Sequence, residues 1–589
     1  MEKRWVLKEQ GESEQVKRLS EELNISEVLA NLLVQREVYS YDAAKTFFRP
    51  ELSHLHDPFL MKDMNRAVHR IHKALNRGER ILIYGDYDVD GITSVALLYN
   101  FFINHHDKID FYIPDRYNEG YGISYKSIDF ASQNNFSLII ALDCGIKAVE
   151  KIDYARKKHI DFIICDHHRP GDELPKAAAV LDPKRNDCNY PYKELSGCGV
   201  GFKLIQAYSQ EYKLPFASLK KYLDLVAISI AADIVPITGE NRILAFYGLK
   251  HINFKPRPGV RALVEKFGKF DRNVDRSRKS FFKKDLTISD LVFSIGPRIN
   301  AAGRLENGKN SVRLLVCNEQ FEAEEIAFQI NNLNTERRSL DNHTTEEALF
   351  QISKDRLHKD KKATVVYNEK WHKGVIGIVA SRLMEQYYRP TIVLTKSNNL
   401  ITGSARSIKG FDVYEAIDSC SDLLEHFGGH KYAAGLSLKS ENLSEFISRF
   451  ETFVNENIGE DDLVPEIEID TDLDLEQLDG IKGEFFKVLK QFAPFGPGNP
   501  SPIFRTLGLK DTGFSRIVGS KHLKMKVTPV NSDYQSPRLD AIAFQLGDEV
   551  NYKWISKSFP FSICYQVEEN AWQGRLDLQL NVKDIKLEM

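Results

Sequence analysis

The sequence predicts an α/β protein with a parallel-sheet domain, a long connecting helix, a smaller α/β domain and a C-terminal β-barrel. Three patterns predict this fold. Apolar runs of strand length alternate with helix-length stretches, then comes a long polar stretch without Gly or Pro, and the last part consists of short alternating runs separated by turn residues. A chain of 589 residues is also too long for one hydrophobic core, so several domains are expected.

The parallel sheet is predicted by five short apolar runs in the first third of the chain. Helix-length stretches such as 92–103 and 148–159 separate most of them, which is typical of parallel strands joined by helices. In open sheets of this kind, ligands bind beyond the carboxyl ends of the strands, so the residues after each run are candidates for a site. The runs are ILIYG (81–85), IDFYI (109–113), LIIAL (138–142), DFIIC (161–165) and AAAVL (177–181).

The rest of the chain divides into three further regions. Residues 319–353 predict the long helix, because Ile326, Ile330 and Leu333 stand near helical spacing. A second α/β unit is expected from the strand-like runs at 363–367 and 391–395. Short alternating runs after residue 464 predict the small barrel. We expect boundaries at 1–55 (an N-terminal segment without an assigned role), 56–318, 319–355, 356–462 and 463–589.

The composition excludes several classes of protein. With 80 basic and 83 acidic residues the net charge is −3, so a surface for nucleic acid would have to be a local basic patch. The seven cysteines are scattered without a C-x-x-C pair, which indicates a reducing compartment rather than a zinc or redox motif. The sequence shows no signal peptide and no apolar stretch of about 18 residues. We therefore expect a cytoplasmic protein that does not enter a membrane. A monomer is also expected, although the composition does not determine the oligomeric state.

Acidic and imidazole side chains follow three of the predicted strands. The first strand is followed by GDYDVDG (85–91), the third by Asp143 and the fourth by DHH (166–168). Carboxylates packed so closely raise one another's pKa unless cations neutralise them, and a mixed Asp/His shell suits Mn²⁺ better than an all-oxygen Mg²⁺ or Ca²⁺ site. Two ions about 3.5–4 Å apart would support an in-line displacement at phosphorus. The pattern therefore predicts a two-metal phosphoesterase.

Two simpler interpretations account for parts of this pattern. Asp-x-Asp-x-Asp-Gly also begins a calcium-binding EF-hand loop, but the twelfth position, which needs an acid, is Leu97, and a strand rather than a helix precedes the loop. A single Asp at a strand end, such as Asp143, is usually a helix N-cap. Acids or imidazoles at three strand ends together favour the metal site.

Longer motifs surround these residues in a fixed order. The first unit contains GDYDVDG (85–91), LDCG (142–145), CDHH (165–168), AADIVP (231–236) and GPRINAAGR (296–304). The later part contains WHKGVIGIVASRL (371–383), GSARS (403–407), FGGHKYAAG (427–435) and APFGPGNPSPIF (493–504). Over about residues 60–589 these motifs resemble the DHH phosphoesterase superfamily, most specifically the RecJ family of single-strand DNA exonucleases. The resemblance implies a DHH domain, a DHHA1 domain and an oligonucleotide-binding (OB) barrel.

By position, the resemblance implies the residues of the reaction centre. His168 corresponds to a residue that contacts the scissile phosphate or transfers a proton, and Asp86 to an assisting acid. Asp166 is expected to orient a histidine or cap the following turn, because a metal-bound imidazole commonly donates its other N–H to a carboxylate. Tyr84 stands where phosphatase members have a ligand histidine, which favours the exonuclease branch. The implied ligands of two Mn²⁺ or Mg²⁺ ions are Asp88, Asp90, Asp143 (which bridges the ions), His167 and Asp233.

A second group of positions is implied to bind nucleic acid. Phosphate clamping and base stacking are implied for Arg116, Tyr121, Arg298 and Arg304, although core packing of the tyrosine and surface ion pairs of the arginines remain alternatives. The family's anchor for the 5′ end is implied at Ser404 and Arg406. The last group is the Gly-Gly-His segment of Gly428, Gly429 and His430, which can also be a tight turn.

The resemblance implies an enzyme that degrades single-stranded DNA from its 5′ end to mononucleotides in recombination and repair. Its expected partners are the DNA strand, a single-stranded-DNA-binding protein and a repair helicase. One alternative is a nanoRNase or a nucleotide or cyclic-dinucleotide phosphodiesterase of the same superfamily, which the barrel and Tyr84 disfavour. Another is a catalytically inactive DNA-binding relative, which is disfavoured because every acid position is filled.

Overall fold

The computed structural model describes residues 3–116, 118–265, 281–282, 284–305, 308–355, 358–397, 399–519, 521–533, 536–572 and 575–588. The chain forms two compact units, each assembled from segments that are distant in sequence. One unit contains Trp5–Tyr112, Gly122–Gly296 and Ile467–Met589. The other contains Met1–Arg4, Ile113–Tyr121 and Pro297–Glu466.

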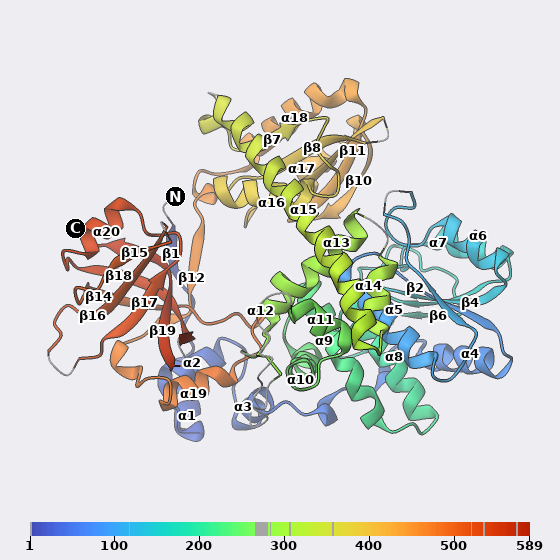
Figure 1. The fold of residues 1–589 in the computed structure, drawn as a ribbon, viewed down its shortest axis with the longest axis horizontal. Helices are drawn as coiled ribbons and strands as arrows, with labels where there is room; N and C mark the ends of the chain where they lie inside the picture. Colours follow the sequence, from blue (N-terminus) through green and yellow to red (C-terminus); the bar gives the residue numbers. More distant parts are fainter. Residues whose placement is uncertain are drawn as a thin grey trace. The chain divides into compact units, whose positions relative to one another are not determined.

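Five parallel strands form the first sheet, in the order β3-β2-β4-β5-β6. Side chains alternate between its faces, so that Leu82 and Tyr84 pack with helices α6 and α7 while α5 and α8 contact the sheet from the other side. Figure 1 shows this sheet with its helices. The bounds are α4 (Met64–Asn76), β2 (Arg80–Gly85), α5 (Val89–Phe102), β3 (Ile109–Tyr112), α6 (Tyr125–Gln133), β4 (Phe136–Leu142), α7 (Val149–Lys157), β5 (Asp161–Cys165), β6 (Ala179–Leu181) and α8 (Gly197–Glu211).

Helices complete this part of the unit. Helix α9 is buried along almost its whole length against α5, α8 and α10, because its sequence is almost entirely apolar. The short connector from Asp233 to Thr238 joins it to the next helix. The helices are α9 (Leu223–Ala232), α10 (Gly239–Phe254), α11 (Pro258–Glu265) and α12 (Ile288–Asp290).

The second unit combines a long helix with a mixed sheet. Helix α15 (Gln320–Lys354) buries Ala323, Ala327 and Ile330 at helical spacing, which confirms the predicted long helix. In the sheet β10-β11-β9-β8-β7, the pairing of β7 with β8 is parallel and the other described pairings are antiparallel. The remaining elements are α13 (Gly296–Leu305), α14 (Lys309–Val316), β7 (Thr364–Tyr367), α16 (Ile376–Tyr387), β8 (Thr391–Ser397), β9 (Leu400–Arg406), α17 (Val413–Asp418), β10 (Leu424–His430), β11 (Ala433–Leu438) and α18 (Leu443–Asn457).

The C-terminal strands form the predicted barrel. Their order is β13-β14-β18-β19-β17-β16-β15, and the additional pairing of β14 with β16 closes a ring of five strands. Alternate residues of β16, such as Leu523 and Met525, are buried inside. The elements are β12 (Glu466–Ile469), β13 (Thr471–Asp472), α19 (Glu484–Gln491), β14 (Phe504–Asp511), β15 (Arg516–Val518), β16 (His522–Pro529), β17 (Leu539–Ala543), α20 (Glu549–Ile555), β18 (Phe561–Trp572) and β19 (Arg575–Leu587).

The N-terminal segment, to which the sequence assigned no role, packs against this barrel. Leu19, Leu29 and Leu33 belong to the same buried cluster as Phe485 and Phe504. The segment comprises β1 (Arg4–Leu7), α1 (Ser13–Leu23), α2 (Glu27–Val34) and α3 (Tyr41–Phe48). The sheets, the long helix and the barrel together confirm the predicted fold class. Among the described helices, none is both long and apolar enough to cross a membrane.

Candidate metal centre

The predicted acids and histidines gather where the order of the parallel sheet reverses. From β2 the chain first adds β3 on one side and then returns to add β4 on the other, so the helices that follow these two neighbouring strands cover opposite faces of the sheet. Ligands of open parallel sheets bind at such switch points. The loop 86–88 and the start of α5 follow β2, Asp143 follows β4, and Asp166 follows β5. The topology therefore brings three strand ends to one edge.

The loop after β2 places two carboxylates by means of helix ends. Asp88 caps α5, because its side chain accepts a hydrogen bond from the Gly91 amide at 3.0 Å. Asp90 lies in the first turn of α5, and its carboxylate accepts from the amides of Gly197 and Cys198 at 2.7 and 2.8 Å. These amides begin helix α8, whose positive end stabilises the carboxylate. Ser229 Oγ donates a further bond to Asp90 at 2.7 Å.

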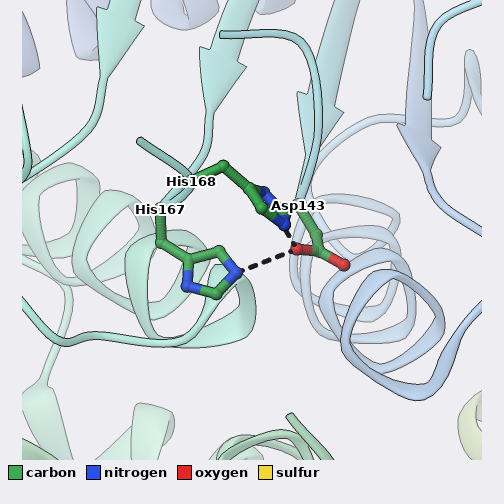
Figure 2. A group of neighbouring side chains, drawn as sticks. All are labelled: Asp143, His167 and His168. Carbon is green, nitrogen blue, oxygen red and sulfur yellow. Dashed lines mark hydrogen bonds and ion pairs between the residues drawn. The ribbon is translucent and has the colours of Figure 1, made fainter. Parts of the chain in front are cut away.

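Asp143 and His167 form the centre of the group. Asp143 has a φ of 57°, in the left-handed region that residues other than glycine rarely adopt, and such strain is concentrated at functional sites. His167 Nε2 lies 3.1 Å from Asp143 Oδ1. Figure 2 marks this contact with a dashed line. The same nitrogen lies 3.7 Å from Asp90 Oδ2 and 3.5 Å from Asp233 Oδ2. One imidazole nitrogen thus faces three carboxylates from separate segments of the chain.

Burial and mutual repulsion shift the pKa values of these groups. Burial, followed by Asp90 and Asp88, raises the pKa of Asp143 well above its usual value. Burial and then Asp90 likewise raise the pKa of Asp88, and that of Asp233 to about 8. Burial lowers the pKa of His167. These directions mean that burial and crowding penalise the ionised carboxylates around His167, a penalty that divalent cations would offset.

The donor set fits a divalent metal. Two groups have ligand atoms within 4.8 Å of one another: Asp143, His167 and His168, and Asp90, His167 and Asp233. Carboxylate oxygens with imidazole nitrogen suit Mn²⁺ among the divalent ions. The His167 Nδ1 atom is buried and has no hydrogen-bond partner among the described residues, so the ring is not held by a protein acceptor on that side. The residues present are therefore compatible with an Asp/His metal centre.

Asp166 contacts the histidines without facing the centre of the group. Its Oδ1 atom accepts from the amides of His167 and His168 and lies 2.7 Å from His168 Nδ1, while Oδ2 accepts from the Ile146 amide. Despite burial, the bond to His168 lowers the pKa of Asp166 to about 2. Burial acts to lower the pKa of His168, but the bond to Asp166 outweighs burial and raises this pKa to about 9. Asp166 thus fixes the ring of His168, whose side chain is 34% exposed.

Asp86 and Tyr84 have different surroundings from the group around His167. Asp86 is buried, and its Oδ1 atom accepts from the Gly122 amide at 3.2 Å. Tyr84 donates its hydroxyl hydrogen to the Gly122 carbonyl oxygen at 2.7 Å and stacks on Tyr112. Tyr84 is therefore a core residue that supports the segment after Tyr121.

Several contributors to the site were missed from the sequence. Asp182 directly follows β6 and is buried, and burial raises its pKa to about 7. Its signal was the same as that of Asp143, an acid at the end of an apolar run. Gly197 permits the approach of α8, because a Cβ there would lie 2.7 Å from Asp143 Cβ. The SGCGVG run (196–201) was the signal for that close packing.

The structure brings four of the predicted nucleic-acid-binding residues onto one face of the second sheet. Cross-strand pairing aligns Ser404, Gly435 and Gly428 in one row and Arg406, Ala433 and His430 in the next. Paired residues point to the same face, whereas Gly429 belongs to the alternate row with Ala434. Helix α16 begins over this face, because a Cβ on Gly377 would lie about 3 Å from both Ser404 Oγ and the Arg406 guanidinium.

The other predicted contacts of nucleic acid lie in the same unit. Arg304 donates to the Gly374 carbonyl at 3.0 Å, and Arg116 lies close enough to Lys373 to help lower the pKa of that lysine, which burial lowers most. Lys373 was missed from the sequence. Arg298 donates to Asn331 on α15, and burial lowers its pKa to about 10. Tyr121 is 52% exposed, so it is not a core residue.

Comparison with known proteins agrees with this geometry. Residues 80–230 match the family model described as DHH family, N-terminal domain, residues 360–456 match the DHHA1 domain, and residues 469–584 match the RecJ OB domain. The single-stranded-DNA-specific exonuclease RecJ of Bacillus subtilis is 37% identical over 585 residues, which cover 99% of this chain and 70% of that protein. The chain belongs to the RecJ family. The Escherichia coli protein of the same name is 34% identical over 548 residues, covering 89% of this chain and 90% of that protein.

Solved structures of the RecJ family contain metal. The crystal structure of RecJ from Thermus thermophilus in complex with Mn²⁺ matches with a TM-score of 0.81 and 26% identity, covering 100% of this chain and 80% of that one. The Mg²⁺ complex of RecJ from the same organism matches with a TM-score of 0.76 and 25% identity, covering 100% and 79%. Divalent metal is thus bound by relatives of the same fold.

The geometry predicts that metal binding depends on Asp143. We expect Asp143→Ala to weaken Mn²⁺ binding by more than about tenfold, since even the loss of an outer-shell partner commonly costs that much. Calorimetric titration of the metal-free protein measures the affinity. Asp153→Ala, which removes a carboxylate from the exposed face of α7, is the matched control and should bind Mn²⁺ normally. Equal affinities of the two folded variants would contradict a metal centre at Asp143.

Proposed function

We propose that this chain is a metal-dependent exonuclease that hydrolyses single-stranded DNA from its 5′ end to mononucleotides, in recombination and repair. The observation that carries the proposal is the pair of overlapping Asp/His groups that share His167 at the switch point of the parallel sheet. Family membership supports the substrate, because the curated relatives are single-stranded-DNA-specific exonucleases. The half-buried guanidinium of Arg406 on the second sheet supports the use of a strand end.

Two divalent ions, Mn²⁺ or Mg²⁺, complete the proposed centre. When bound, they neutralise the crowded carboxylates, polarise the phosphodiester and lower the pKa of the attacking water. Asp143 is the residue proposed to be shared, as the resemblance to the RecJ family implies, and its Oδ1 atom faces His167 (Figure 2). The proposed ligands are Asp88, Asp90, Asp143, His167 and Asp233.

His168 is proposed to act on the scissile phosphate. Asp166 holds its Nδ1 side at 2.7 Å, so Nδ1–H donates to the carboxylate and the other ring nitrogen can face a phosphate oxygen or the leaving group. The Asp166 carboxylate is itself fixed by three backbone amides. Asp86 is proposed to assist by holding Gly122 after β3.

The second unit is proposed to hold the 5′ end of the strand. The Arg406 guanidinium donates to Ser404 Oγ, Ser381 Oγ and its own neighbour's carbonyl, and no carboxylate among the described residues pairs with it. Burial lowers the pKa of the half-buried Arg406, so the charge has lost part of its water and has no carboxylate partner among the described residues. A phosphate beside the first turn of α16 would supply the missing anion. Ser404, Gly428 and His430 border the same face.

A basic group beside this face is proposed to follow the DNA backbone. The loop that holds Lys373 leads into α16, Arg304 donates to its Gly374 carbonyl, and Arg116 lies near Lys373. Cations this close together repel one another unless anions lie between them. Arg298 and exposed Tyr121 are proposed to contribute phosphate contact and stacking, and Gly429 to shape the hairpin.

We propose that the enzyme works as a monomer in the cytoplasm, where a helicase and a single-stranded-DNA-binding protein present the strand. Its domains are proposed to follow the boundaries expected from the sequence, at 1–55, 56–318, 319–355, 356–462 and 463–589. The N-terminal segment then serves as part of the barrel module, whose core it shares.

Digestion of end-labelled single-stranded DNA tests the proposed activity. A 5′ label should appear in mononucleotides at once, whereas a 3′ label should stay in long products until late. Chelator should abolish turnover and added Mn²⁺ should restore it, because the carboxylates need a cation. Folded Asp143→Ala should keep less than about a tenth of wild-type turnover, which raises the barrier by more than about 1.4 kcal/mol. Early release of a 3′ label, or activity after exhaustive removal of metal, would overturn the proposal.

Loss of Ser404 and Arg406 should weaken binding of the strand end more than it affects the metal centre. Binding of 5′-phosphorylated linear DNA and of a circle of the same sequence can be compared in chelator, which prevents cleavage. We expect the double variant Ser404→Ala, Arg406→Ala to lose about tenfold or more of the preference for the linear strand, since charged hydrogen bonds contribute about 1.5–3 kcal/mol. Exposed Arg449, paired with Asp422 and Glu445, gives the control Arg449→Ala. A double variant with the wild-type preference would exclude the anchor.

The barrel should hold the strand by electrostatic contact through three lysines, Lys521, Lys524 and Lys526. Lys524 and Lys526 alternate with buried residues on β16 and so face outward, opposite Ile542 and Asp540 on β17. Changing all three to Ala should flatten the slope of log K against log salt by about 0.7 per lost phosphate contact. The control changes exposed Lys482, Lys487 and Lys557 of the same module. A slope equal to that of the control would mean that the strand runs elsewhere.

A further inference from the structure

The connector between α9 and α10 directly follows Asp233. Asp233 ends α9, and Thr238 precedes α10, so the residues between them are not held by a helix. Ile234 adopts a left-handed φ of 60° and is exposed, whereas Ile237 is completely buried. The position of this short segment therefore depends on what packs around Ile237, together with the hydrogen bonds that Asn241 and Tyr192 donate to the Pro236 carbonyl.

The loop at 493–499, which leads into the barrel, is the part of the chain that meets Ile237. The Ile237 amide donates to the Pro497 carbonyl at 2.6 Å. Gly496 lies so close that an added Cβ would be 2.6 Å from Ile237 Cγ1. Gly498 has a φ of 72°, and a Cβ added to it would lie 3.0 Å from Thr238 Cγ2 and 3.2 Å from Pro236 Cβ. Two glycines and one hydrogen bond thus fit this loop closely onto the connector.

The loop is itself rigid, because buried polar groups fix its backbone. The Asn499 side-chain amide donates to the carbonyls of Phe492 and Pro494 at 2.8 and 2.9 Å, and Asn499 is 1% exposed. Arg36, from the N-terminal segment, donates to Asn499 Oδ1 at 2.8 Å. Arg242, in the first turns of α10, donates to four consecutive carbonyls from Gln491 to Pro494. A rigid element therefore contacts a connector without secondary structure.

We propose that the loop 493–499 is a positioning element of the metal centre, which sets the place of Asp233 through Ile237. This inference rests on the proposed role of Asp233 as a ligand. Gly496, Gly498 and Asn499 are positioning residues in it, since they touch the connector or the loop and not the reacting atoms. The barrel module then contributes to metal affinity as well as to contact with the strand.

Physical reasoning favours this role over simple packing of two surfaces. A ligand carboxylate that is displaced loses metal affinity, and outer contacts that orient ligands commonly alter affinity by about 10- to 100-fold. The Asp233 side chain is 27% exposed, against 1% for Asp90 and 2% for Asp143, so it has fewer neighbours of its own to fix it. Its main chain is held on one side by α9, where the Asp233 amide donates to the Ser229 carbonyl at 2.9 Å, and on the other side by the connector.

Mn²⁺ titration of the metal-free protein tests the proposal, with near-ultraviolet circular dichroism to show that each variant is folded. Gly496→Ala should push Ile237 aside and raise the Kd for Mn²⁺ at the Asp233 site by about tenfold. The combination Gly496→Ala, Ile237→Ala removes the clash, so its Kd should lie within about threefold of that of Ile237→Ala alone. Such a rescue would not follow from general loss of stability.

Two further variants separate the possible causes. Gly508→Ala strains the barrel at a φ of 63° with no atom near the new Cβ, and it should leave Mn²⁺ binding unchanged. Asp233→Ala shows whether Asp233 is a ligand at all. If it binds Mn²⁺ normally, the ligand assignment fails and this inference fails with it.

If Asp233→Ala weakens binding but folded Gly496→Ala does not, the ligand assignment stands and the positioning role is wrong. Loss of affinity in Gly508→Ala equal to that in Gly496→Ala would also overturn the role, because barrel strain alone would then explain the effect. Should Gly496→Ala fail to fold, Gly498→Ala gives the same test through Pro236 and Thr238. A folded Gly498→Ala with wild-type affinity would reject the role.

Discussion

Repulsion between buried carboxylates is the constraint around which the parallel-sheet domain is built. Asp143 lies beside Asp88, Asp90 and Asp233, and burial with this crowding raises its pKa well above the usual value. Such a group destabilises the fold unless neutral donors or cations offset it. The fold supplies part of the offset, since the first amides of α8 and Ser229 donate to Asp90. Metal supplies the rest in the function proposed here.

Close backbone packing is what allows these groups to meet. Gly91 must lack a side chain, because a Cβ there would lie 2.3 Å from the Asp86 carbonyl oxygen. Gly197 lets α8 come within reach of Asp143, and Asp143 itself takes a left-handed backbone conformation. The geometry of the site therefore includes conformational strain, and the packing of the buried sheet and helices around the site must offset it.

Local patterns predicted the sheet and its strand-end residues, but contacts between distant segments left no local signal. Alternating apolar runs place Asp143, Asp166 and His167 at one edge, because parallel strands all end on the same side. Asp233 was assigned by resemblance alone, since it ends a helix rather than a strand. The packing of Leu29 and Leu33 against the barrel joins segments from opposite ends of the chain, and amphipathic helices alone do not specify their partner.

Arg242 shows why the parallel-sheet domain and the barrel module are not independent. Its guanidinium is buried, stacks over the Phe47 ring, and donates to five carbonyl oxygens, one from Phe47 and four from the segment Gln491–Pro494. No carboxylate among the described residues pairs with it, so these carbonyl dipoles replace the water that the charge has lost. Separation of the two modules would leave the Arg242 charge without these carbonyl acceptors. The segment Gln491–Pro494, which binds Arg242, leads into the loop 493–499 that packs against Ile237. The Arg242 charge therefore joins the two modules and also stabilises the loop that is proposed to position Asp233.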